Sequence, residues 1–271
     1  MPEGHTIHKL ARDLTRDLAG EVVRASSPQG RFEDGASCID GLTLRGAEAW
    51  GKHLLLDFPD APVHVHLGLF GRFRRRRSPA PEPRGAIRLR LCGPKWTWDL
   101  SGPTACEILV GQGWESIVDR LGADPLRADP DVEGALTRIQ ASRRTIGELL
   151  LDQTIIAGIG NVYRAELLFL AGIHPQRRGT EVAEAELTDL WERSVEQLER
   201  GVKLGRIVTV DEKAPPRGER LWAYKRRVCR RCEGRIRALM LGARRIWYCP
   251  TCQPRRPGAR KRVARSGRAR S

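Results

Sequence analysis

Residues 144–171 read RTIGELLLDQTIIAGIGNVYRAELLFLA, and this stretch decides how the second half of the chain folds. Its two ends, 144–152 and 161–171, are rich in leucine and predict helices. The segment between them, 153–160, carries two glycines and predicts a turn. A further helix is predicted over 184–202, so this half of the chain is expected to be helical.

Upstream of that stretch the pattern changes. Residues 4–19 place apolar side chains on one face at helical spacing, which predicts an amphipathic helix followed by a glycine cap. From 21 to 110, short runs of valine, leucine and isoleucine alternate with glycine and proline, which predicts an antiparallel β-sandwich. Five arginines and then three prolines mark 72–85 as an exposed loop. The polar segment 211–220 contains two prolines and is predicted to be a linker.

Composition limits the class of protein. The chain has 271 residues, 40% of them hydrophobic, which is enough for two domains with packed cores. Its net charge is +15, from 48 basic and 33 acidic side chains. No apolar run approaches the roughly 20 residues that cross a bilayer, and the amino terminus does not have the pattern of a signal peptide. We therefore expect a soluble, cytoplasmic protein without a membrane partner.

About half of the positive charge lies in a tail, residues 255–271. This tail contains eight basic residues and no acidic one, which leaves 40 basic against 33 acidic side chains in the rest of the chain. Its composition predicts disorder. The tail fits two interpretations, nonspecific contact with nucleic-acid phosphates or a solvated segment that aids solubility.

Four of the seven cysteines are Cys229, Cys232, Cys249 and Cys252. They form two Cys-x2-Cys pairs with sixteen residues between them, which predicts a structural, tetrahedral Zn²⁺ site without an open coordination position. The residues between the pairs are expected to form a β-hairpin, and a module this small needs such a metal to fold. Two arginines of the hairpin, Arg244 and Arg245, are either solvated or form a fork for a phosphate.

The chain begins Met1-Pro2-Glu3-Gly4, and methionine before proline is normally removed. Removal would leave Pro2 as a secondary amine. Because an α-amine has a pKa of about 7.7–8.0, part of it is neutral at pH 7 and can attack an electrophilic carbon. Glu3 beside it could transfer protons. Most Met-Pro starts have no chemical role, so this motif needs support from the rest of the chain.

That support comes from five further motifs, which occur in order along most of the chain. They are Trp50-Gly51-Lys52-His53-Leu54, His66-Leu67-Gly68-Leu69-Phe70-Gly71, Arg120-Leu121-Gly122-Ala123-Asp124-Pro125, Leu151-Asp152-Gln153 with Gly158-Ile159-Gly160-Asn161-Val162-Tyr163, and the cysteine hairpin through Gln253. Together with Pro2-Glu3-Gly4 they resemble the formamidopyrimidine-DNA glycosylase and endonuclease VIII family, most of all its actinobacterial endonuclease VIII-type members. Three departures are His5-Thr6, where the family commonly has Pro-Glu, Gly68, where some endonuclease VIII members carry a DNA-contacting glutamine, and the basic tail.

The resemblance implies an α+β, multidomain fold. An amino-terminal helix and antiparallel β-sandwich would form the catalytic domain over 1–125. A helix–two-turn–helix DNA-binding domain would follow over 126–222, then the four-cysteine zinc hairpin over 223–254 and the disordered tail over 255–271.

The resemblance also implies catalytic roles. Pro2 would be the nucleophile that attacks C1′ of a damaged nucleotide, and Glu3 the general acid and base. Lys52 would contact a phosphate and assist β-elimination, although on its own it could be an ordinary lysine at a strand end. Arg244 would clamp the phosphates that flank the lesion and promote δ-elimination.

Four further residues would bind DNA. Arg120 would hold the backbone at the domain junction, and Asn161 would hold a phosphate with nearby backbone N–H groups, unless it is a plain helix cap. Leu69 and Phe70 would fill the space left by a flipped-out base, or they belong to the sandwich core. His64 and His66, which alternate along one strand, are interpreted as structural or phosphate-contacting groups, because no third partner for a metal is evident.

The implied function is that of a bifunctional DNA glycosylase and abasic-site lyase that excises oxidised pyrimidines. Its partner would be double-stranded damaged DNA, its cofactor structural Zn²⁺, and its state a monomer. One alternative is a preference for oxidised purines. Another is a noncatalytic DNA-binding paralogue, which the joint presence of Pro2, Glu3, Lys52 and Arg244 disfavours, because binding alone needs neither a free amine nor an acid beside it.

Overall fold

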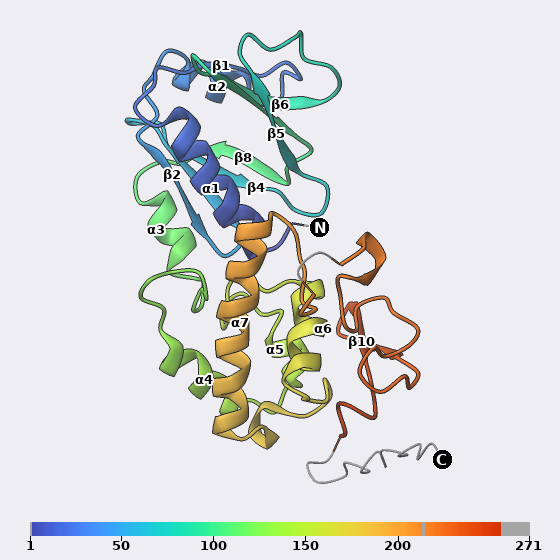
Figure 1. Ribbon diagram of the computed structural model, residues 1–271. Coiled ribbons are helices and arrows are strands. Elements are labelled where there is room, and N and C mark those ends of the chain that lie inside the picture. The colour runs from blue at the N-terminus through green and yellow to red at the C-terminus, as the bar shows by residue number, and fades with distance from the viewer. Residues whose placement is uncertain (1, 213–214, 256–271) are drawn as a thin grey trace, which may run out of the picture.

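The amino-terminal part of the chain is an antiparallel β-sandwich with helices packed against it (Figure 1). The computed structural model describes residues 2–212 and 215–255. One sheet has the strand order β1-β6-β7-β5 and the other β2-β3-β4-β8. The strands are β1 (Arg24–Ser26), β2 (Gly46–Trp50), β3 (His53–Asp57), β4 (Val63–His66), β5 (Arg72–Arg77), β6 (Ile87–Cys92), β7 (Trp96–Ser101) and β8 (Ala105–Ile108). The helices are α1 (Gly4–Leu18), α2 (Glu33–Ile39) and α3 (Gly113–Val118). The predicted fold class is confirmed.

Apolar side chains from both sheets and from α1 fill one core. Ile7, Leu14 and Leu18 of α1 are fully buried against the sheets, as their spacing predicts. Gly20 has a φ of +79°, the left-handed conformation expected just after the helix.

The arginine run is a strand, so the prediction of a loop over 72–85 is wrong for 72–77. β5 is an edge strand that pairs with β7 along its whole length. Its arginines are exposed while Phe73 packs against the core, and the guanidinium of Arg75 lies 3.4 Å from the ring centroid of Trp96. An edge strand tolerates this charge because long side chains reach solvent from it.

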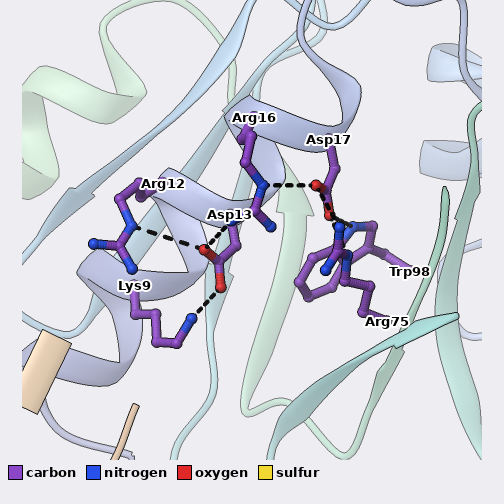
Figure 2. Close-up of polar contacts among 7 residues, drawn as sticks. All are labelled: Lys9, Arg12, Asp13, Arg16, Asp17, Arg75 and Trp98. Carbon is purple, nitrogen blue, oxygen red and sulfur yellow. Dashed lines mark hydrogen bonds and ion pairs between the residues drawn. The ribbon is translucent and has the colours of Figure 1, made fainter. Parts of the chain in front are cut away.

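Asp17 ties α1 to the first sheet (Figure 2). Its carboxylate is 2% exposed and accepts hydrogen bonds from Arg75 Nη2 at 2.9 Å, from the Trp98 indole at 3.2 Å and from Arg16 at 3.0 Å. One turn earlier, Asp13 is bonded to Lys9, Arg12 and Arg16, whose side chains are 33–53% exposed. The two aspartates therefore differ in what their removal should cost.

We expect Asp17→Ala to lower the free energy of unfolding by about 3 kcal/mol, because it removes a buried carboxylate with three hydrogen-bond partners and leaves the buried Trp98 indole without its acceptor. Asp13→Ala should cost about 1 kcal/mol or less, because its partners remain solvated. Urea denaturation followed by tryptophan fluorescence measures both. Equal losses in the two variants would contradict the anchoring role of Asp17.

The middle of the chain is helical, as predicted from the sequence. Its helices are α4 (Val132–Gln140), α5 (Ile146–Leu149), α6 (Asn161–Leu170) and α7 (Glu184–Leu204), which enclose a second core. The helix predicted over 144–152 is shorter than expected. It begins at a capping box between Thr145 and Glu148 and ends at Leu149, three residues before Asp152, whose carboxylate accepts from Thr154.

The carboxyl-terminal module is a β-hairpin of β9 (Arg237–Leu241) and β10 (Arg244–Tyr248), with Gly242 at a φ of +57° in its turn. Leu241 and Ile246 extend into the helical core. The fully buried carboxylate of Glu166 on α6 accepts from the backbone N–H groups of Trp222, Ala223 and Tyr224 at 2.7–2.9 Å. The start of the module is therefore fixed to α6.

The tail that is predicted to be disordered, 255–271, lies outside the described residues, except for Arg255. Among the described residues, no helix is both long and apolar enough to cross a membrane.

Candidate active site

Glu3 lies at the amino-terminal end of α6, far away in sequence. Its carboxylate is fully buried and accepts hydrogen bonds from the N–H groups of Gly160 at 3.0 Å, Val162 at 2.9 Å and Tyr163 at 3.2 Å. These are the unpaired donors of a helix start, where negative charge is favoured. Burial raises the pKa of Glu3, while Lys52 and the three amides oppose that rise. The partly buried Pro2 precedes it.

Close backbone packing seats the amino terminus on the turn between α5 and α6. Gly4 N donates to Gly158 O at 2.8 Å. A Cβ on Gly4 would lie 2.9 Å from Gly158 Cα, and one on Gly51 would lie 2.9 Å from the Ala157 side chain. Since real Cβ atoms do not approach so closely, glycine is required here, and the motifs that carry these glycines meet in space.

Lys52 lies in the turn between β2 and β3 and points to the same helix start. Its Nζ donates to Ile159 O at 2.6 Å. Burial lowers the pKa of Lys52 to about 8, with the charge of Arg244 acting in the same direction and that of Glu3 against it. Glu3, Lys52 and Arg244 are therefore near one another, although they come from three separate parts of the sequence.

Asn161 and Arg164 join α6 to the hairpin. The Asn161 side chain donates to Arg245 O at 3.1 Å and accepts from Arg164, whose guanidinium also donates to Gly147 O at 3.0 Å and Arg245 O at 3.2 Å. The cap of α6 is Gly160 and not Asn161. The N–H groups of Gly160, Val162 and Tyr163, which lie next to Asn161 in the chain, donate to Glu3.

The remaining predicted DNA contacts are on the surface. Arg120 is exposed just after α3, and its charge lowers the pKa of His53, which places it on the Lys52 side of the second sheet. Leu69 and Phe70 follow β4 and are 52% and 85% exposed. The alternative that they belong to the sandwich core is therefore wrong. Arg244 and Arg245 begin β10 and are both exposed.

Two important polar residues had no role in the sequence analysis. Asp124 is fully buried and accepts from His8 and from Gly51 N at 2.7 Å each, which fixes the lysine-bearing turn to α1. Gln153 accepts from Gly158 N at 3.0 Å and donates to Leu151 O and Ile159 O. Both belong to the family-like motifs, at 120–125 and 151–153, so their place in these motifs is the sequence feature that indicates their importance.

The four cysteines of the carboxyl-terminal module converge. Their Sγ atoms all lie within 4.8 Å of one another, at 3.8 Å for Cys229 and Cys252 and 3.5 Å for Cys232 and Cys249. Four thiolates about 2.3 Å from a central Zn²⁺ would be about 3.8 Å apart, so the cluster has the size of a tetrahedral metal site.

Two family models match the chain. The formamidopyrimidine-DNA glycosylase N-terminal domain matches residues 1–98, and the H2TH domain of the same glycosylase matches residues 121–212. Among solved structures, the Lactococcus lactis Fpg bound to DNA with an abasic site is similar with a TM-score of 0.79. It is 24% identical, and the match covers 93% of this chain and 99% of that one. This likeness supports the fold.

Curated relatives cover the whole length. The chain is 46% identical to Endonuclease 8 1 of Mycobacterium tuberculosis over 267 residues, which covers 93% of the chain and all of the relative. It is 30% identical to the formamidopyrimidine-DNA glycosylase of Methylococcus capsulatus, with the same coverage. On this similarity and on the fold, the chain belongs to the formamidopyrimidine-DNA glycosylase and endonuclease VIII family of DNA-repair glycosylases.

Proposed function

We propose that this protein is a bifunctional DNA glycosylase and abasic-site lyase that excises oxidised pyrimidines from duplex DNA. The observation that carries the proposal is the buried Glu3 carboxylate, held at the start of α6 next to Lys52 and directly after Pro2. A carboxylate that only stabilised the fold would not need a neighbouring lysine with a lowered pKa. A carboxylate that transfers protons beside a terminal amine would use such a lysine.

In the proposed mechanism, the Pro2 nitrogen forms a bond to C1′ as the bond from C1′ to the damaged base breaks and the base leaves with the electron pair and a proton. Glu3, whose pKa burial raises, protonates the sugar ring oxygen as the ring opens and an iminium forms. Loss of a C2′ proton then expels the 3′ phosphate. Lys52, with a pKa of about 8, is partly neutral near pH 7 and can take up or give a proton there.

The DNA contacts are proposed from charge and exposure. Arg244 and Arg120 would hold phosphates beside the lesion, and Arg244 would assist the second, δ-elimination. Asn161 would hold a phosphate at the start of α6 and would also keep the hairpin in place through its bond to Arg245 O. The exposed Leu69 and Phe70 would fill the gap left by the extruded nucleotide.

The metal and the assembly complete the proposal. Zn²⁺ held by the four cysteines would be structural, since all four positions would be filled by thiolate. The proposed domains are residues 1–125, 126–222 and 223–254. We further propose that the protein acts as a cytoplasmic monomer.

The proposed preference for one class of damaged base rests on the similar proteins. Pyrimidine preference is supported by the similarity to the mycobacterial proteins named Endonuclease 8 1. Oxidised purines are the second candidate, because the chain is also 30% identical to a relative named formamidopyrimidine-DNA glycosylase.

Borohydride trapping tests the reaction class. We expect the protein to form a covalent adduct with duplexes that contain thymine glycol or an abasic site, because borohydride reduces the iminium to a stable amine. Gel analysis of the products should show both 3′ and 5′ phosphate ends, the result of β,δ-elimination. Tight binding of these duplexes without an adduct would favour the noncatalytic paralogue instead.

A further inference from the structure

Three histidines gather at one end of the second sheet, beside Lys52. His53 begins β3, and its partner in the register of β4 is His66. The rings of His53 and His64 are within 17° of parallel with centroids 5.2 Å apart, and the ring centroid of His66 lies 4.9 Å from that of His53. The cluster ends where the exposed loop with Leu69 and Phe70 begins.

Two of these imidazoles form a hydrogen-bonded chain with a carboxylate. His53 Nδ1 lies 2.9 Å from His64 Nε2, and His64 Nδ1 lies 2.8 Å from Glu107 Oε1. The His64 side chain is 6% exposed, whereas that of Glu107 is 57% exposed. A carboxylate only accepts hydrogen bonds, so Nδ1 of His64 carries a hydrogen.

One hydrogen must then lie between the two rings, and it can belong to either. In the neutral chain His53 donates it from Nδ1, so Nε2 of His53 keeps its lone pair and can only accept. When the chain gains a proton, His64 donates from both nitrogens and the hydrogen of His53 moves to Nε2, which becomes a donor. A single proton therefore reverses the hydrogen-bonding character of the outer nitrogen of His53.

The surrounding charges decide which form is populated. Lys52 and Arg120 lie on the His53 side, His66 lies beside it on β4, and the negative Glu107 is at the far end on β8. Glu48 of β2 is paired with Arg127. Burial lowers the pKa of His53 to about 3, helped by His66, His64, Arg120 and Lys52, so the free protein favours the neutral chain. A phosphate beside Lys52 and Arg120 would act in the opposite direction.

We propose that His53, His64 and Glu107 form a proton-linked phosphate site. Docking of a DNA phosphate beside Lys52 and Arg120 is accompanied by uptake of one proton into the chain, and Nε2 of His53 then donates to that phosphate. The site rests on the proposed function, because its ligand is the backbone of the DNA that Lys52 contacts. Because the bound form holds the extra proton, affinity must rise as the pH falls.

The test is the pH dependence of binding to a duplex that carries a tetrahydrofuran abasic analogue, which has no leaving group at C1′. Fluorescence anisotropy with the full chain, at fixed ionic strength between pH 5.5 and 7, gives Kd. We expect Kd to fall as the pH is lowered, by at most about tenfold per pH unit, which is the limit for one linked proton. Calorimetry in two buffers of different ionisation enthalpy counts the protons directly.

Two variants and a control assign the linkage. Glu107→Gln removes the charge that stabilises the protonated chain, and His53→Gln supplies an amide donor that needs no proton. Both should bind with little pH dependence, while Glu48→Gln, which removes a carboxylate from the neighbouring strand, should keep the wild-type slope. Equal slopes in the wild type and Glu107→Gln overturn the site, even if trapping succeeds. A wild-type protein that binds no DNA overturns the proposed function as well.

Discussion

An amino-terminal extension that keeps Pro2 inside a peptide bond is expected to abolish the borohydride-trapped adduct. An amide nitrogen has no free electron pair for attack at C1′, so the loss should be on the order of 10³-fold or more. Pro2→Gly should also reduce trapping sharply, because it replaces the secondary amine with a primary one. The measurement is the fraction of abasic DNA trapped at a fixed time, with the processed terminus verified by mass spectrometry.

The control is an extension of the same length at the carboxyl terminus, which should leave trapping unchanged. Removing the amino-terminal extension with a protease that leaves Pro2 first should restore it. Binding to the tetrahydrofuran duplex should change little, since Glu3 and Gly4 can still bond to Gly160 and Gly158. An extended protein that traps DNA at the wild-type rate would exclude Pro2 as the nucleophile.

Replacement of Cys249 by serine is expected to have the second large effect. Cys249 is fully buried, and serine is a poor zinc ligand, so the variant should lose the proposed Zn²⁺, whose binding would contribute on the order of 10 kcal/mol to folding such a module. β10 would then no longer be held on α6, and Arg244 would be lost from beside Lys52. We expect trapping and strand cleavage to fall by on the order of 10²-fold.

Zinc content per chain, thermal unfolding and trapping are measured on the same samples. Cys38→Ser is the matched control, because Cys38 is exposed on α2 and far from the cluster in sequence. It should match the wild type in all three measurements. A Cys249→Ser protein with one zinc per chain and wild-type cleavage would show that the cluster has no part in the reaction.

The sequence predicts the fold well where local pattern and packing agree. The apolar face of 4–19, the segment 161–171 and the four cysteines each predict an element that the structure contains. In these places the residues that signal the element also form its core or its four-cysteine cluster, so local reasoning suffices.

Prediction fails where distant parts of the chain override local composition. Five arginines suggest a loop at 72–77, yet pairing with β7 and stacking on Trp96 make it a strand. The sequence does not decide whether Phe70 is buried or exposed, because an aromatic residue after a strand suits a core as well as a surface. In the structure it is exposed.

The candidate site shows the same limit. The buried carboxylate of Glu3 depends on amides more than 150 positions away, which no spacing along the sequence reveals. The chain from His53 to Glu107 likewise depends on the register of three strands. The motifs indicate which segments form the site, but only the fold determines which of their atoms form hydrogen bonds with one another.

The contact between Glu3 and the start of α6 has a consequence for the maturation of the protein. The amides that fix Glu3 are synthesised 157 residues after it. At about 5–20 residues per second, the ribosome needs roughly 8–30 s to reach them. During that interval Glu3 has no docking partner, so a peptidase that removes Met1, as the proposed function requires, would act on an open terminus. Under the proposal, the order of synthesis would thus separate trimming of the first residue from docking of Glu3 on α6.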